Sequence, residues 1–209
     1  MIPTKEVMKN GWDGRFPMEF YEKLQVSEVA IAGLGGLGSH IAVMLARSGV
    51  GKLQLVDFDK VDVSNLNRQE YDIRHLGRLK TEALSERLRE INPYLELCVD
   101  TVRVIPENVS ALFSRQRIVC EAFDVPEQKA MLINTLLAQC PNTIVVAGNG
   151  MAGFGDANTI RTRKAGSRFY LCGDEQTDVQ AGIGLMAARV SICAGHQANQ
   201  VIRLILKAD

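Results

Sequence analysis

A cluster of carboxylate, amide and basic side chains lies in the first half of the 209-residue chain. It consists of Asp57, Asp59, Ser64, Asn65, Asn67, Arg68 and Gln69, followed by Lys80. Carboxylate and amide oxygens suit a magnesium ion, whereas arginine and lysine offset the negative charge of phosphates and of a departing pyrophosphate. The combination therefore predicts a site for a nucleoside triphosphate with its magnesium ion. The alternative interpretation is a solvated polar loop.

A glycine-rich turn before this cluster has the spacing of a phosphate-binding loop. An apolar run at 29–32 precedes the turn, and an apolar-periodic stretch typical of a helix follows it. The glycines are Gly33, Gly35, Gly36 and Gly38. Glycine permits positive φ and the close approach of a phosphate, and N–H groups at a helix N-terminus attract anions. Asp57 follows Gly33 by 24 residues, where a Rossmann-like unit keeps a carboxylate for the ribose hydroxyls.

The glycine turn alone has other interpretations. By itself it favours a nicotinamide or flavin enzyme, and a turn that only lets a helix pack on a strand is the structural alternative. A dinucleotide enzyme has little need for so many charged and amide groups beside its glycine loop, because the backbone already holds its pyrophosphate. The polar cluster therefore favours a triphosphate.

The elements that must position these residues alternate between strands and helices. Strands are predicted at 29–32, 52–57, 96–101, 118–123 and 143–147, and helices at 39–48, 79–91, 107–115 and 126–139. The segments 159–163 and 168–172 predict two antiparallel strands, followed by a glycine-rich link and a long helix ending at Leu206. The expected fold is α/β and Rossmann-like, a doubly wound and mainly parallel sheet with helices on both faces and an antiparallel extension near the C-terminus. Asp57 and Asp124 fall at carboxyl ends of strands, where such folds bind ligands.

Composition limits the classes of partner. The 24 basic and 24 acidic residues balance, so no bulk positive field favours nucleic acid or an anionic membrane. No charged leader precedes an apolar run, and no apolar stretch is long enough to span a bilayer. We therefore expect a cytoplasmic protein that binds neither nucleic acid nor membrane. Five scattered cysteines without Cys-x-x-Cys spacing predict mostly buried thiols.

Several longer motifs resemble one family over nearly the whole chain. They are GLGGLGS, LVDFDKVDVSNLNRQ and GRLK, then CEAFDVPEQKAMLIN around Asp124, GMAGFG, and the C-terminal TDVQAGIGLMAARVSICAGHQANQVIRLIL. They resemble the adenylation domain of ubiquitin-activating-type enzymes and their bacterial relatives ThiF, MoeB and HesA. The EAFD, MAGFG and FYLCGD segments and the short length resemble the compact ThiF-type branch. The resemblance implies a single ATP-binding adenylation domain over 1–209, with an N-terminal helical segment at 1–27.

The resemblance also implies roles for individual residues. ATP would lie over the glycine loop at 33–38, with its ribose hydroxyls on Asp57. The residues implied to grip the triphosphate are Asn65, Arg68, Gln69 and Lys80. Asp124 matches the magnesium-linked carboxylate, and Asp59 is a further candidate for that role. Arg15 is the best match for an arginine that reaches into the ATP site of the neighbouring protomer of a homodimer, and a plain surface charge is the alternative.

The activity that the resemblance implies is an adenylyltransferase with ATP and Mg²⁺. The C-terminal Gly-Gly carboxylate of a small ubiquitin-fold, ThiS-like sulfur carrier would attack the α-phosphate, giving acyl-adenylate and pyrophosphate for thiamine thiazole synthesis. The alternatives are a different carrier such as the small subunit of molybdopterin synthase, a small-molecule substrate, a nicotinamide-dependent oxidoreductase, and a scaffold without activity.

Two departures from the family pattern concern cysteine. Many relatives bind zinc through two Cys-x-x-Cys pairs, but only Cys172 stands in that region, so no zinc is expected. Relatives also carry a cysteine that bonds covalently to the carrier, and Asp178 aligns with it here. A carboxylate cannot replace a thiolate in that step, so the covalent step is expected to be missing. Cys172 is the alternative thiol, and a buried structural role is favoured for it.

Overall fold

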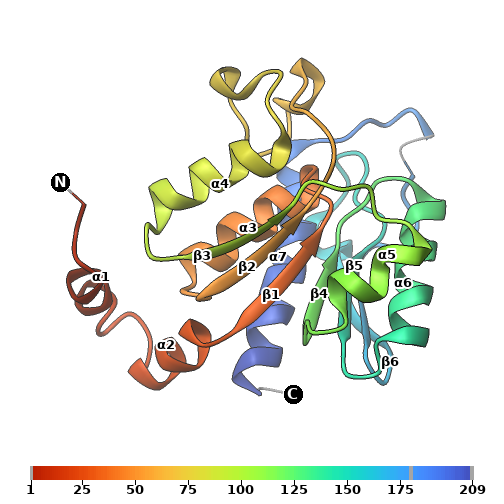
Figure 1. Cartoon of the computed structure of the whole chain (residues 1–209). Coiled ribbons are helices and arrows are strands. Elements are labelled where there is room, and N and C mark those ends of the chain that lie inside the picture. The colour runs from red at the N-terminus through yellow and green to blue at the C-terminus, as the bar shows by residue number, and fades with distance from the viewer. Residues whose placement is uncertain (1, 179–180, 208–209) are drawn as a thin grey trace.

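The structure is a computed structural model that describes residues 2–178 and 181–207. These residues form one seven-stranded sheet with the order β3-β2-β1-β4-β5-β7-β6 (Figure 1). The strands are β1 (Glu28–Ala32), β2 (Lys52–Val56), β3 (Glu96–Asp100), β4 (Ile118–Glu121), β5 (Ile144–Gly148), β6 (Arg161–Gly166) and β7 (Phe169–Gly173). All neighbouring strands pair in parallel except β6 and β7, which are antiparallel. The predicted Rossmann-like fold with an antiparallel extension is confirmed.

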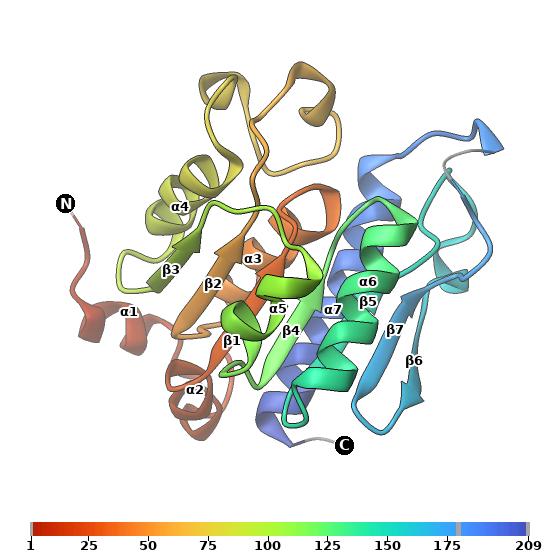
Figure 2. The same ribbon diagram turned by 45° about the vertical axis from the view of Figure 1, so that its right-hand side comes forward.

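Helices cover both faces of the sheet (Figure 2). One face carries α3 (Gly36–Arg47), α4 (Lys80–Ile91) and α7 (Ala187–Leu206), and the other carries α5 (Pro106–Phe113) and α6 (Pro126–Gln139). Two short helices, α1 (Lys5–Gly11) and α2 (Met18–Gln25), precede β1. The described chain also contains the 3₁₀ turns Val63–Asn65, Ile73–His75 and Ala157–Thr159. No helix among the described residues combines the length and the apolar character needed to cross a membrane.

The central strands are buried on both faces. In β1, Ile31 packs in the core beneath α3 and α7, whereas Ala30 and Ala32 pack in the core beneath α5 and α6. Burial on both sides explains why the strand is a continuous apolar run rather than an alternating one. The strand order reverses between β1 and β4, which is the position where open α/β sheets bind ligands beyond the carboxyl ends of their strands.

Most element boundaries lie within two residues of the prediction, and two of the differences have a clear local reason. Helix α3 begins at Gly36 instead of residue 39, so part of the glycine-rich turn is itself the first turn of the helix. Strand β6 begins at Arg161 instead of residue 159, because Asp156 accepts a hydrogen bond from the Asn158 N–H at 2.9 Å and caps a 3₁₀ turn. The predicted helix 126–139 has the observed bounds of α6, which starts with a proline at its first position.

The approach of α3 to β1 generates the first prediction. A Cβ added to Gly38 would lie 1.8 Å from the Gly33 carbonyl oxygen, whereas a Cβ on Gly195 in α7 would have no neighbour within 4 Å. We expect Gly38→Ala to lower the free energy of unfolding by about 2 kcal/mol or more, because backbone must move. Gly195→Ala, the control, should raise it by about 0.5 to 1 kcal/mol. Urea denaturation measures both, and equal stabilities for the two variants would contradict the steric argument.

Candidate functional site

A cavity of about 570 Å³ lies at the carboxyl ends of the central strands. Its wall includes Gly33, Gly35, Gly36, Asp57, Asp59, Asn65, Arg68, Gln69, Lys80 and Asp124. These residues follow β1, β2 and β4 or begin α3 and α4. The structure therefore brings the predicted nucleotide-binding residues, except Gly38 and Arg15, together around one space.

The glycine turn leaves the start of α3 open. Gly33 adopts φ +89°, and a Cβ there would lie 2.8 Å from the carbonyl oxygen of Ala122. Gly35 occupies the N-cap position, and within the described chain no side chain caps the helix. The N–H groups of an uncapped first turn are available to an anion, and Gly35, Gly36 and Leu37 all line the cavity.

Asp57 joins the glycine turn to the end of β2. Its Oδ2 accepts a hydrogen bond from the Leu34 N–H at 2.6 Å, and its Oδ1 accepts one from the Asp59 N–H at 2.7 Å. The residue is buried, yet it forms part of the cavity wall. Each carboxylate oxygen retains a second acceptor position, which fits the hydroxyl groups of a ribose.

Lys80 brings a buried positive charge to the cavity. Its Nζ lies 3.0 Å from Asp59 Oδ2, and its backbone N–H donates to the Asp59 carbonyl at 2.9 Å. The residue is only 7% exposed. An ammonium has three donors, and Asp59 is its one side-chain partner in the described residues, so donors remain for phosphate oxygens.

The segment after the first 3₁₀ turn contributes an arginine and an amide. Arg68 Nη1 donates to the Ser64 carbonyl at 2.9 Å and to Asn67 Oδ1 at 2.7 Å, which orients the guanidinium. Gln69 is 9% exposed, and its Oε1 has no hydrogen-bond partner in the described part of the chain. Buried polar atoms are normally satisfied, so this oxygen is a contact point for a bound group or a water molecule.

A buried ion pair supports the turn that carries Asp124. Glu121 is fully buried and accepts hydrogen bonds from the Phe123 N–H and from Lys129 Nζ, both at 2.8 Å. Lys129 Nζ also donates to the Phe123 carbonyl at 3.0 Å. Burial raises the pKa of Glu121, and Lys129 counteracts this rise. This pair was not predicted from the sequence, although a glutamate inside an apolar strand was a signal.

The loops near α7 close the far wall of the cavity. Arg189 is 4% exposed; its Nε donates to the Ala152 carbonyl at 3.1 Å, and its Nη2 donates to Asp174 Oδ2 at 2.6 Å. Ala152 lies in the cavity wall, and so does Thr177, which donates to Asp174 Oδ2. This network was not predicted from the sequence either, because its members are far apart along the chain.

The carboxylates fit a magnesium ion that arrives with a nucleotide. Asp124 is exposed in the cavity wall and has no hydrogen-bond partner among the described residues, whereas Asp59 is paired with Lys80. Among the described residues of the chain, no three His, Cys, Asp or Glu side chains lie together in a group that could hold a metal ion. Magnesium is commonly held by one or two carboxylates together with substrate phosphates, so this donor set suits a metal–nucleotide complex.

All five cysteines are described, and none lines the cavity. Cys98 is exposed and the other four are buried. Burial raises the pKa of Cys172 to about 11 and that of Cys193 to about 12. Such thiols are poor nucleophiles at neutral pH. Asp178 does belong to the cavity wall.

Two residues predicted for the nucleotide site, Gly38 and Arg15, lie outside the cavity, and so does His196. Gly38 is buried beneath the glycine turn, against Gly33. Arg15 is exposed and lies between α1 and α2. Trp12 of the same segment lies beside Gly49, which precedes the amino end of β2. The segment is therefore at the end of the sheet opposite the cavity (Figure 1). His196 has its Nδ1 2.9 Å from Thr162 Oγ1, which agrees with a packing role.

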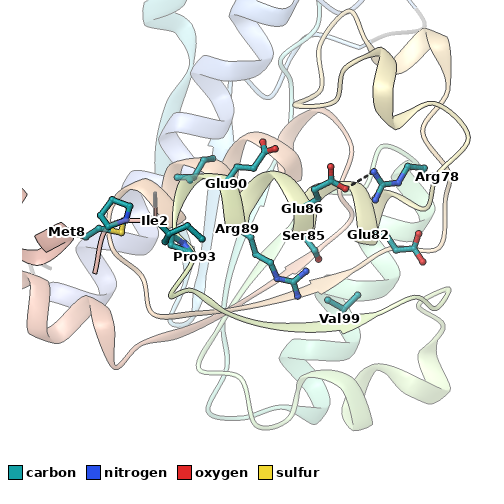
Figure 3. Close-up of a pocket in the computed structure, with 12 residues that line it drawn as sticks. Ile2, Met8, Arg78, Glu82, Ser85, Glu86, Arg89, Glu90, Pro93 and Val99 are labelled. Carbon is teal, nitrogen blue, oxygen red and sulfur yellow. Dashed lines mark ion pairs between the residues drawn. The ribbon is translucent and has the colours of Figure 1, made fainter. Parts of the chain in front are cut away.

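A second hollow of about 970 Å³ lies between the N-terminal segment, α4 and the edge strand β3 (Figure 3). Its wall contains Ile2, Met8 and Val99 and the ion pair between Arg78 and Glu86. It contains none of the predicted site residues. The smaller cavity is therefore the candidate functional site.

Comparison with known proteins decides the family. Residues 12–209 match the ThiF family. The chain belongs to the ThiF family. The family match agrees with the resemblance that the sequence motifs indicated. The glycine turn and the polar cluster that carry this resemblance line one cavity.

Two curated relatives place this ThiF-family chain among enzymes with different substrates. It is 37% identical over 130 residues to the tRNA threonylcarbamoyladenosine dehydratase of Haemophilus influenzae, covering 61% of this chain and 50% of that protein. It is 31% identical over 211 residues to the molybdopterin-synthase adenylyltransferase of Salmonella typhimurium, covering 97% of this chain and 80% of that protein. The chain thus spans only about half the length of the first of these relatives.

The fold also matches solved structures. The crystal structure of the Escherichia coli tRNA N6-threonylcarbamoyladenosine dehydratase TcdA in complex with ATP aligns with a TM-score of 0.87 at 22% identity. The alignment covers 100% of this ThiF-family chain and 98% of that chain. At this identity the match supports the shared fold.

Proposed function

We propose that this chain is an adenylyltransferase that uses ATP to activate the C-terminal glycine carboxylate of a small ubiquitin-fold sulfur carrier. One observation carries the proposal. A single cavity joins an uncapped helix N-terminus, a buried carboxylate suited to a ribose, and the cations Arg68 and Lys80. That combination matches a nucleoside triphosphate better than a dinucleotide, whose pyrophosphate needs no further cations.

The proposed reaction asks little covalent chemistry of the protein. An oxygen of the carrier's carboxylate forms a bond to the α-phosphorus, and the bond from that phosphorus to the oxygen bridging the β-phosphate breaks, releasing pyrophosphate. The carboxylate is already ionised at neutral pH, so no general base is needed. Arg68 and Lys80 offset the charge that moves onto pyrophosphate, while Asp57 holds the ribose.

Magnesium, bound with the nucleotide, would neutralise phosphate charge, with Asp124 as its proposed protein ligand and Asp59 as a second candidate. The turn that bears Asp124 is fixed from behind by the Glu121–Lys129 pair. A fixed carboxylate without a protein partner is suited to such a role.

For the carrier, we propose a ThiS-like protein of thiamine thiazole synthesis. The EAFD, MAGFG and FYLCGD segments support this branch. The Salmonella relative is named for molybdopterin synthase, which makes that enzyme's small subunit the alternative carrier. The Haemophilus relative is named for tRNA, but the balanced charge of this chain favours a protein substrate over RNA.

We further propose that the protein works as a homodimer in which Arg15 completes the partner's site. Arg15 is exposed, and its segment packs near the amino end of β2, whereas the cavity lies at the carboxyl ends of the strands. A role for Arg15 in ATP binding therefore requires a second copy of the chain.

ATP–pyrophosphate exchange in the presence of a carrier ending in Gly-Gly tests the activity. We expect Lys80→Ala and Arg68→Ala each to lower exchange by about a hundredfold, because each removes a charge that stabilises the departing pyrophosphate. Lys60→Ala is the matched control, since Lys60 is exposed and outside the cavity. Activity of the cavity variants within a few fold of the wild type would remove both residues from the site. Exchange that depends on tRNA instead of a carrier would overturn the choice of substrate.

Mixed dimers test the role of Arg15. Arg15→Ala and Lys80→Ala protomers are each expected to be nearly inactive, but a hybrid dimer would contain one site with both residues intact. Mixing equal amounts of the two variants should therefore restore exchange to about a quarter of the wild-type value, because random pairing makes about half of the dimers hybrids and each hybrid has one intact site of two. Absence of recovery in dimers shown by mass spectrometry to be mixed would rule out action across the interface.

The cysteines generate a separate prediction about the product. Because no thiol lines the cavity, the acyl-adenylate should be the last intermediate formed on this chain. Mass spectrometry under non-reducing conditions should show no covalent enzyme–carrier adduct, and Cys172→Ala should retain exchange. A carrier-linked species lost specifically in Cys172→Ala would show that the buried thiol becomes accessible and reacts.

A further inference from the structure

Glu70 directly follows Arg68 and Gln69, but its side chain does not line the cavity. Its carboxylate is bound by side chains from two helices. Oε1 lies 2.9 Å from His40 Nδ1 of α3, and Oε2 accepts hydrogen bonds from Arg87 Nε at 3.0 Å and Arg87 Nη2 at 2.8 Å from α4. Glu70 therefore anchors the segment behind the cavity to both helices.

The same contacts extend to the backbone of the cavity wall. His40 Nε2 lies 3.1 Å from the carbonyl oxygen of Arg68 and 3.3 Å from Ser191 Oγ of α7. One imidazole thus contacts both the anchor, Glu70, and the backbone of a residue in the wall. A shift of Glu70 would move Arg68 with it.

A serine completes the connection to the glycine turn. The Ser39 hydroxyl donates to the Gly35 carbonyl at 2.7 Å and accepts from the Glu70 N–H at 3.2 Å. The glycine turn and the segment 68–70 are therefore joined by one hydroxyl. The distance between the uncapped N-terminus of α3 and the Arg68 side chain depends on this connection.

The Glu70 carboxylate is a strong hydrogen-bond acceptor because it stays ionised. The hydrogen bond from His40, with help from Arg87, lowers the pKa of Glu70 to about 2. The carboxylate is consequently ionised at every pH at which the protein would meet ATP, and hydrogen bonds to an ionised acceptor are stronger than those to a neutral one.

We infer that Glu70 is a positioning residue for the nucleotide: held by His40 and Arg87, it sets where Arg68 and Gln69 stand relative to the glycine turn. Nucleotide affinity then depends on a side chain that does not touch the nucleotide. The inference rests on ATP as the ligand of the cavity, which is part of the proposed function, but it does not depend on the identity of the carrier.

The chain offers a matched control for this residue. Glu86 of α4 pairs with Arg78 at 2.7 Å, so it too is a glutamate bound by an arginine (Figure 3). Neither partner lines the candidate site. Replacing Glu86 by glutamine removes an ion pair without disturbing the segment 68–70.

Equilibrium binding of MgATP, measured by calorimetry on the full chain, tests the inference. Glu70→Gln keeps the size of the side chain but replaces the carboxylate that binds His40 and Arg87 with a neutral amide. We expect this change to weaken ATP binding about tenfold. Where exchange is measured, KM for ATP should rise by a similar factor while kcat falls far less than in Arg68→Ala, since the Arg68 charge remains in the site and only its position is less well held. Glu86→Gln should bind ATP within about twofold of the wild type.

A second substitution removes the Glu70–Arg87 contact by changing the arginine. Arg87→Gln should weaken ATP binding, and Glu70→Gln/Arg87→Gln should bind no more weakly than Glu70→Gln alone, because the two residues act through one contact. Arg87→Gln keeps the test open if Glu70→Gln does not fold. Melting temperatures of all variants separate a loss of affinity from a loss of fold.

Several outcomes would overturn the inference. They are wild-type affinity in the Glu70 and Arg87 variants, an equal loss in Glu86→Gln, a fall in kcat at unchanged affinity, and a wild-type chain that does not bind ATP. A wild-type chain that binds ATP but shows no carrier-dependent exchange would instead refute the proposed activity and leave the role of Glu70 standing.

Discussion

The close approach of the Gly33 carbonyl to the backbone of Gly38 is the constraint on which the rest of the site depends. A side chain on residue 38 would occupy the position of that oxygen, since its Cβ would lie 1.8 Å away. With glycine there, α3 begins almost directly after β1, at the point where the strand order reverses. Asp57 then closes the turn by accepting the Leu34 N–H. The first turn of α3 consequently faces the cavity without a cap.

Acidic side chains support this cavity from several directions. Asp57 holds the glycine turn, Glu70 holds the segment with Arg68, and Glu121 holds the turn before Asp124. Each is satisfied by backbone N–H groups or by a basic side chain of the protein. Removing Lys129 would leave the buried charge of Glu121 uncompensated, and all three carboxylates support the wall of the proposed nucleotide site.

Local signals in the sequence predicted the elements well. The bounds of α6 match because a proline opens the helix and the apolar spacing continues to its end. The site residues after β1 and β2 were predicted because they are close together along the chain. The Arg189–Asp174 and His40–Glu70–Arg87 contacts were not, because their members are separated by turns and whole helices, and no periodicity links them.

The sequence by itself determined the alternation of strands and helices, the position of the glycine turn, and a set of side chains with the chemistry of a triphosphate site. These properties depend on neighbours within a few residues. Only the tertiary structure decided which charged groups remain for a ligand and which are committed to the protein. Asp59 is paired with Lys80, whereas Asp124 stands in the wall without a hydrogen-bond partner in the described chain. The reason is physical: whether a charge is compensated depends on what lies within a few ångström of it in space, and segments far apart in the chain supply those neighbours.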